Sequence, residues 1–255
     1  MPKLTFVVPA HGRLALAAIC LRQLRRTCDL LIESGVEAGA VVVSDRRTLA
    51  TLDPLALGFG TVVRDNEYLS RKFNDGIQLA CDPEFNDDPA DFVVPFGSDD
   101  WADHRIFLEP LPGPDTVQGF QWMSFVSEDG TEISTTFLDY EGGSGIRIIP
   151  RELVAPLGYR PADEDRPRGC DTSILRNLKA HHGARMKVKH FHMHPRQIVD
   201  WKSPEAQLNS YRDVTAVRRS EAADDPFAVL GEFYPAEALD EMQAHYMGAK
   251  VGACA

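Results

Sequence analysis

The chain has 255 residues, a formal net charge of −11 and five scattered cysteines, namely Cys20, Cys28, Cys81, Cys170 and Cys254. This length fits one large α/β domain or two small ones, and the acidic balance disfavours strong non-specific binding to nucleic acid or to an anionic membrane. No apolar run approaches the ~20 residues that span a bilayer, and no signal-peptide pattern opens the chain. Because the cysteines lack CxxC spacing, we expect reduced thiols and a cytoplasmic protein.

Strand and helix patterns alternate through the first 105 residues. Buried-type strands are expected at 3–10, 39–45, 60–65 and 91–96, and helices at 14–33 and 70–80. This order predicts βαβ units and a largely parallel sheet.

The second half changes character. Two β-rich runs flank Asp129-Gly130, a hairpin signal, and a strand at 146–150 leads into a short helix that Gly158 closes. Polar loops are expected at 141–145 and 160–169, a helix at 170–183 and a strand at 186–194. Beyond Pro195 the pattern weakens, with helices expected at 203–214 and 235–247.

Polar side chains follow three of the expected strands, at the point where each ends. They are His11 and Arg13 after the first, Asp45 after the second, and the adjacent Asp99 and Asp100 in "DFVVPFGSDDW". Ligands bind outside the carboxyl ends of parallel strands, and a hard divalent cation would neutralise the paired acids and bridge a diphosphate. The plainer interpretation is that the two acids cap a helix or lie in a solvated turn.

The order of these segments resembles the GT-A fold, family 2 glycosyltransferases, which use nucleotide-diphosphate sugars. The resemblance implies a metal-dependent inverting glycosyltransferase, and a UDP-sugar is the expected donor. "LTFVVPAHGR" is similar to the first strand and nucleoside loop of that family, "VVVSD" to its second strand, "SRKFNDGIQLA" to its Asn-x-Gly helix and "FVVPFGSDDW" to its Asp-x-Asp metal motif. The resemblance implies one α/β domain with a mostly parallel, Rossmann-like sheet, helices on both faces and a smaller β-hairpin region for the acceptor. The GT-A domain would span 1–200, with a nucleotide-sugar half at 1–105 and an acceptor half at 106–200, followed by a C-terminal helical extension at 201–255.

The same resemblance assigns residues to the donor site. Those expected at the nucleotide sugar are Pro9, His11, Arg13, Asp45, Arg71, Asn74 and Asp99. Asp99 and Asp100 would hold Mn²⁺ or Mg²⁺. The first acid of the usual Asp-x-Asp-Asp motif is missing, because Gly97 stands in its place. For Arg71 and its neighbour Lys72, a solvated helix surface is an equally good interpretation.

An inverting transfer needs a general base on the acceptor side. "GCDTSILRNL" is similar to the family segment that carries it, which makes Asp171 the predicted base. The alternative is an acid that only stabilises a helix N-terminus.

Three histidines alternate in "HFHMHP" and would share one face of a strand. The resemblance suggests His192 or His194 as a further metal ligand. A solvated edge strand and a zinc site are the alternatives.

Two other functions remain open. A nucleotidyltransferase would use the same kind of sheet and carboxylate-held Mg²⁺, but "PAHGR" lacks the usual Gly-rich loop. A degenerate GT-A domain would bind a nucleotide or glycan without turnover. The acceptor is open too: a glycan, a protein, a small molecule or a modified nucleic-acid base.

Overall fold

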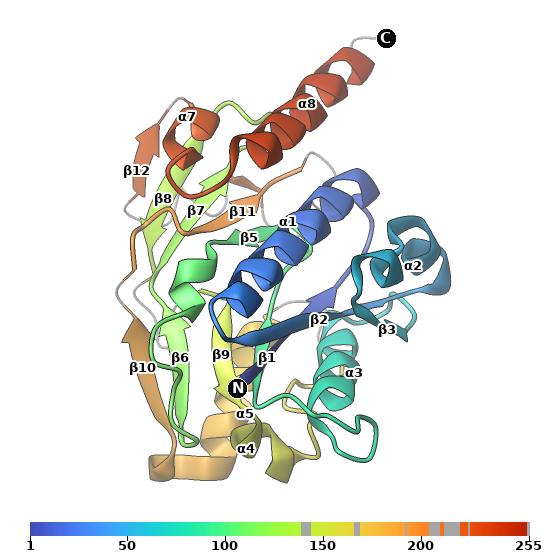
Figure 1. Cartoon of the computed structure of the whole chain (residues 1–255), viewed down its shortest axis with the longest axis vertical. Helices are drawn as coiled ribbons and strands as arrows, with labels where there is room; N and C mark the ends of the chain where they lie inside the picture. Colours follow the sequence, from blue (N-terminus) through green and yellow to red (C-terminus); the bar gives the residue numbers. More distant parts are fainter. Residues whose placement is uncertain are drawn as a thin grey trace.

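The computed structural model describes residues 1–138, 144–165, 169–191, 193–203, 210–211, 220–223 and 225–253. Two β-sheets lie side by side and helices pack against them (Figure 1). The helices are α1 (Leu14–Glu33), α2 (Arg46–Leu52), α3 (Leu69–Cys81), α4 (Arg151–Val154), α5 (Cys170–His182), α7 (Pro226–Leu230) and α8 (Ala236–Ala253).

The central sheet has seven strands in the order β10-β6-β9-β4-β1-β2-β3. Their bounds are β1 (Lys3–Pro9), β2 (Glu37–Ser44), β3 (Gly60–Val63), β4 (Phe92–Pro95), β6 (Thr116–Phe120), β9 (Arg147–Pro150) and β10 (Lys187–Phe191). All neighbours in this sheet are parallel except β9, which runs antiparallel to both β4 and β6.

Helices cover both faces of the central sheet because successive side chains of a strand point to opposite sides. Leu4, Phe6 and Val8 of β1 pack in one core with α1. Val7, between them, packs in a second core with α3 and α5. The predicted α/β architecture, with a mostly parallel sheet between two helical layers, is confirmed.

The smaller sheet has five strands in the order β12-β8-β7-β11-β5. They are β5 (Asp100–Ala102), β7 (Trp122–Val126), β8 (Ile133–Phe137), β11 (Ile198–Trp201) and β12 (Ser220–Ala223). β7 and β8 form the predicted hairpin around Asp129-Gly130. Two links between the sheets are short: β4 continues into β5, and β6 into β7 after Gln121.

The structure departs from the expected boundaries in the C-terminal region. The expected division between residues 200 and 201 falls inside β11. Residues 220–223 pair with β8, so this region contributes a strand as well as the helices α7 and α8. The helix expected at 203–214 lies largely outside the described residues. Of the loop expected at 141–145, residues 141–143 lie outside them as well. Among the described helices, none combines the length and apolar character needed to cross a membrane.

Candidate metal and nucleotide site

Asp99 and Asp100 lie where the chain passes from the central sheet into the smaller one. β4 ends at Pro95 and β5 begins at Asp100. The Oδ2 atom of Asp100 accepts a hydrogen bond of 2.9 Å from the backbone N–H of Gly97. A Cβ at Gly97 would lie 2.6 Å from Asp100 Oδ2 and 3.0 Å from Asp99 Oδ1. Both carboxylates therefore lie beside Gly97, and any side chain at this position would require them to shift.

Asp200 supplies a third carboxylate. β11 runs antiparallel to β5 and places Asp200 opposite Asp100. One ligand atom from each of Asp99, Asp100 and Asp200 lies within 4.8 Å of the others. Asp200 Oδ1 is buried and has no hydrogen-bond partner among the described residues. We refer to Asp99, Asp100 and Asp200 as the acid cluster. An oxygen-only donor set with an unpaired carboxylate oxygen fits Mg²⁺ or Mn²⁺.

Two cations partly offset the acid cluster. Arg13 Nη1 lies 2.5 Å from Asp99 Oδ2, and Lys202 Nζ lies 2.5 Å from Asp200 Oδ2. The pKa of Asp100 is nevertheless raised well above its usual value, first by burial and then by the charges of Asp200 and Asp99. Burial also raises the pKa of Asp200 to about 6. The three acids therefore repel one another in a poorly solvated place, a situation that a bound divalent cation relieves.

A second polar group lies at the carboxyl ends of β1, β2 and β3. Lys72 Nζ, which reaches it from α3, donates to the backbone oxygen of Ala10 (2.6 Å) and to the side chain of Asn66. Asp45 caps α2 and accepts from the backbone N–H and hydroxyl of Thr48 and from Asn66. The two bonds from Thr48 hold the pKa of Asp45 well below its usual range although burial acts in the opposite direction, and the bond from Asn66 adds to the lowering. Hydrogen-bonding side chains are thus gathered beside the loop that follows β1.

Asn74 and Arg71 contact the protein itself. Asn74 is fully buried, and its side chain exchanges two hydrogen bonds with the backbone of Ala162, of 2.9 and 2.8 Å. Arg71 Nη2 lies 2.6 Å from Asp165 Oδ1. In this arrangement the amide of Asn74 bonds to the segment 160–165.

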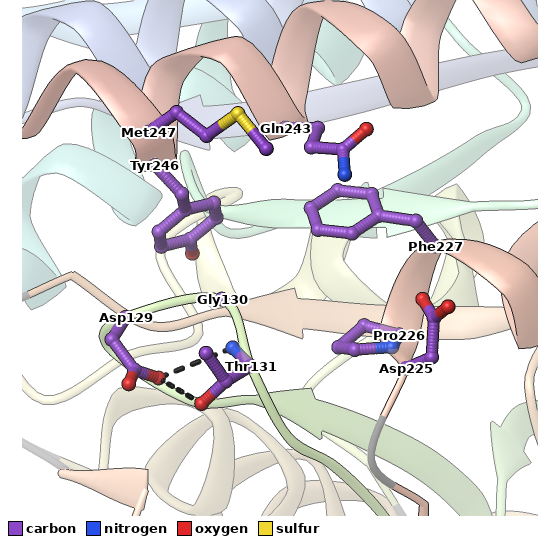
Figure 2. Close-up of a pocket in the computed structure, with 9 residues that line it drawn as sticks. All are labelled: Asp129, Gly130, Thr131, Asp225, Pro226, Phe227, Gln243, Tyr246 and Met247. Carbon is purple, nitrogen blue, oxygen red and sulfur yellow. Dashed lines mark hydrogen bonds between the residues drawn. The ribbon is translucent and has the colours of Figure 1, made fainter. Parts of the chain in front are cut away.

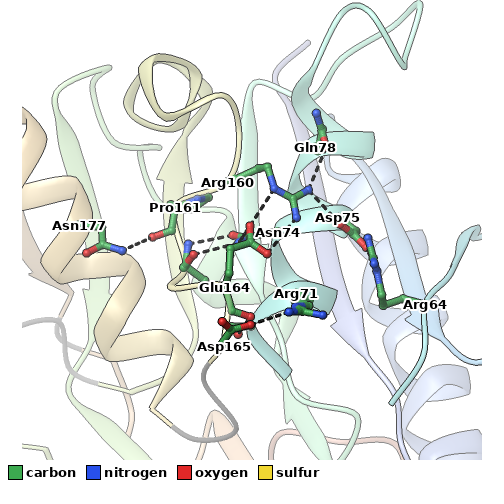
Figure 3. Close-up of polar contacts among 12 residues, drawn as sticks. Arg64, Arg71, Asn74, Asp75, Gln78, Arg160, Pro161, Glu164, Asp165 and Asn177 are labelled. Carbon is green, nitrogen blue, oxygen red and sulfur yellow. Dashed lines mark hydrogen bonds and ion pairs between the residues drawn. The ribbon is translucent and has the colours of Figure 1, made fainter. Parts of the chain in front are cut away.

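The segment 160–165 is fastened between α3 and α5 (Figure 3). Arg160 donates to Asp75 and Gln78 of α3, at 2.9 and 3.1 Å. On the other side, Asn177 of α5 donates to the backbone oxygen of Pro161 at 2.9 Å. The segment therefore connects α5, which carries the predicted base Asp171, to α3, whose Lys72 bonds to the loop after β1.

Asp171 lies in the first turn of α5 and is partly exposed. Its backbone oxygen accepts from Arg147 Nη1 at 2.8 Å, and its Oδ2 lies 3.6 Å from Arg147 Nη2. Arg147 begins β9, and β9 runs antiparallel to β4. The start of β9 therefore lies at the carboxyl end of β4, so Asp171 is at the same edge of the sheet as the acid cluster.

The remaining predicted residues are placed as follows. Pro9 ends β1 and is buried, whereas His11 is exposed in the loop after it. The ring of His194 stacks on Phe233 with centroids 4.6 Å apart. His194 is not part of the acid cluster, whose third member comes from β11 instead. His192 lies outside the described residues.

Sequence reasoning missed Asp200 as a ligand because it stands alone in "IVDW", with no motif around it. Only the pairing of β11 with β5 brings it to the acids.

A separate cavity of about 260 Å³ lies against the smaller sheet (Figure 2). The β7–β8 turn, the start of α7 and the middle of α8 line it, and the rings of Tyr246 and Phe227 are among the lining side chains. No member of the acid cluster lines it.

No protein-family model matches the chain, and no curated protein matches it. Among solved structures, it is similar to a Drosophila β1,4-galactosyltransferase 7 mutant in complex with manganese, UDP-Gal and xylobiose, at 13% identity and a TM-score of 0.49, over 74% of this chain and 65% of that one. The chain thus spans about two thirds of that catalytic domain. It is also similar to glucosyl-3-phosphoglycerate synthase from Mycobacterium tuberculosis in complex with Mg²⁺ and UDP, at 12% identity and a TM-score of 0.47, over 90% and 92%.

The chain is similar to a solved structure of a further kind of enzyme as well. The chain is similar to 4-diphosphocytidyl-2C-methyl-D-erythritol synthase from Anaerococcus prevotii, at 10% identity and a TM-score of 0.42, over 74% of this chain and 87% of that one.

Proposed function

We propose that the protein is a metal-dependent, inverting glycosyltransferase that moves a sugar from a nucleotide-diphosphate sugar to an acceptor hydroxyl. The observation that carries the proposal is the acid cluster, with an unpaired carboxylate oxygen on Asp200, beside the loop after β1. Holding three poorly solvated acids within 4.8 Å of one another is costly, and Arg13 and Lys202 offset only part of their charge.

Each part of the site has a role in this reaction. A Mn²⁺ or Mg²⁺ ion held by Asp99, Asp100 and Asp200 would offset the charge that builds on the leaving diphosphate. Asp45 and the loop after β1, which Lys72 fastens, bind the nucleoside. Asp171 takes the proton of the acceptor hydroxyl as the hydroxyl attacks the anomeric carbon. The buried thiols of Cys20, Cys28 and Cys81 fit a reducing compartment such as the cytoplasm.

The first prediction concerns the third acid. Asp200→Asn and Asp99→Asn should each abolish measurable Mn²⁺ binding and transfer, because each removes one of three anionic ligands. Mn²⁺ binding is followed by electron paramagnetic resonance. Asp115→Asn is the control, since Asp115 forms an exposed pair with Lys187 away from the cluster. Full Mn²⁺ binding by Asp200→Asn would remove Asp200 from the site.

The products separate the three candidate functions. With Mn²⁺ and a panel of nucleotide sugars, a glycosyltransferase slowly releases nucleoside diphosphate even without acceptor, and faster with it. A nucleotidyltransferase instead transfers the nucleotidyl group of a nucleoside triphosphate to a phosphorylated acceptor and releases pyrophosphate. A pure binding domain releases neither, and that result would overturn the proposal.

A further inference from the structure

Two basic side chains contact the acid cluster, and the protein holds them very differently. Lys202 is 4% exposed, and its Nζ lies 5.4 Å from the centre of the Phe125 ring. Its backbone oxygen accepts a 2.5 Å hydrogen bond from the hydroxyl of Tyr246. Lys202 is therefore fixed by packing on one side and by α8 on the other.

Arg13 is held much less firmly. Its side chain is 20% exposed, and among the described residues the guanidinium has one hydrogen bond, to Asp99 Oδ2. It stands in the loop after β1, where both Gly12 (φ 61°) and Arg13 (φ 45°) adopt left-handed backbone conformations. Arginine rarely adopts this conformation, and such strain gathers at functional sites.

Arg13 and a metal ion compete for the same carboxylate. A cation shared by the three acids needs an oxygen of Asp99, and the guanidinium already holds Oδ2 of that carboxylate. A guanidinium that stayed at 2.5 Å from this carboxylate would also place a like charge within a few ångströms of the cation. Lys202 is paired with Asp200 and buried, whereas the side chain of Arg13 is partly exposed and can turn toward solvent.

We propose that Arg13 is a displaceable counter-ion: it neutralises Asp99 while no metal is bound, leaves when the metal binds, and then holds a phosphate of the donor. This inference rests on the proposed function, since it assumes that the acid cluster binds a divalent cation. Arginine suits the second role, because its planar fork matches phosphate oxygens. Metal binding would thereby prepare the site for the nucleotide in one step.

The test is Mn²⁺ binding without nucleotide, measured by electron paramagnetic resonance on the full chain. Arg13→Ala should bind Mn²⁺ about tenfold or more tightly than the unmodified protein, because a charge-assisted hydrogen bond no longer competes. Arg13→Lys, which keeps the charge, should restore most of the weaker affinity. Arg22→Ala is the matched control: it removes the same charge from helix α1, which begins directly after Arg13, but its partner is Glu241 on the surface, so the affinity should not change.

The second measurement is UDP binding at saturating Mn²⁺. Arg13→Ala should bind UDP about tenfold more weakly, since a charged phosphate contact is lost. If the alanine variant does not fold, Arg13→Met keeps the length of the side chain and answers the same question.

The possible failures are distinct. Equal or weaker Mn²⁺ binding by both neutral variants would overturn the role of Arg13 and leave the proposed function standing. Absence of Mn²⁺ binding in every variant, with and without UDP, would overturn the metal-dependent function and this inference together.

Discussion

Lys72 is a charged side chain with almost no contact with solvent. It is 2% exposed, and its ammonium group bonds to the backbone of Ala10 and to Asn66. Burial lowers its pKa to about 8, although the charge of Asp45 acts in the opposite direction. The lysine thus ties the loop after β1 to the segment after β3, at the cost of burying a charge.

The lowered pKa predicts a change of stability with pH. Below pH 8 Lys72 is protonated in both the folded and the unfolded chain, so the full cost of burying the charge is present. Between pH 8 and about 10.5 the folded chain binds fewer protons, and its free energy of unfolding should rise relative to Lys72→Met. The full difference is about 3 kcal/mol at 1.36 kcal/mol per pKa unit.

Urea unfolding of the two proteins from pH 7 to pH 10 measures this difference, because other titrating groups are common to both. A difference that stays constant with pH would mean that the pKa of Lys72 is ordinary.

Asp171→Asn tests the general base. The amide cannot take a proton, so turnover should fall on the order of 10²–10⁴-fold. The affinity for donor and Mn²⁺ should stay close to normal, because Asp171 is not part of the acid cluster. Single-turnover kinetics with a titrated donor separate the two effects. Near-normal turnover would leave Asp171 with only its ion pair to Arg147 and its place in the first turn of α5.

At the scale of elements, the packing of α3 on the central sheet decides where the donor side of the site lies. A Cβ at Gly76 would meet a side-chain carbon of Val7 at 2.4 Å and one of Val43 at 3.0 Å. Because Gly76 has no side chain, α3 lies close to β1 and β2. From there Lys72 reaches the loop after β1 and Asn74 reaches Ala162.

Gly76→Ala should therefore destabilise the protein, although alanine favours helices. Overpacking costs typically 1–3 kcal/mol, against a gain of up to about 1 kcal/mol in helix propensity. Gly248→Ala is the matched control, since Gly248 is also helical but has no atom within 4 Å of its added Cβ, and it should be neutral or stabilising. Chemical denaturation gives both values. A gain in stability at Gly76 would mean that the helix can move away from the sheet at little cost.

At the scale of the whole molecule, the C-terminal region completes the smaller sheet and packs against the residues that follow Asp100 and Asp200. Trp101 and Trp201, which directly follow Asp100 and Asp200, are buried in one core with Tyr246 of α8. Their rings are in contact, with centroids 4.9 Å apart. Tyr246 also bonds to the backbone of Lys202. The last helix thus fixes the strand that carries Asp200.

Removal of residues 236–255 should accordingly shift tryptophan fluorescence to longer wavelengths and weaken Mn²⁺ binding. The cause is that water reaches the core around Trp101 and Trp201 while β11 loses its support. Far-ultraviolet circular dichroism of the truncated chain checks that the central sheet persists. Unchanged Mn²⁺ affinity in a folded truncated chain would show that α8 does not support the site.

Much of the fold followed from local sequence patterns. The strands β1 to β4, the helices α1 and α3, the β7–β8 hairpin and the acids after β4 were predicted, because apolar periodicity and turn residues act over short distances. The short helix α2 was not predicted, although Asp45 is its cap. Asn74 was assigned to a ligand by resemblance, whereas tertiary packing buries it against Ala162.

The sequence by itself determined that the chain forms an α/β fold whose strands end in polar side chains. The reason is that the apolar run of each strand and the polar residues that follow it are neighbours in the sequence. Only the tertiary structure decided which charges meet. Asp200 is 100 positions from Asp100 and joins it through strand pairing, and Arg13 reaches Asp99 from a different loop. Electrostatic interactions depend on distance in space, so the composition of the acid cluster could be read only from the folded chain.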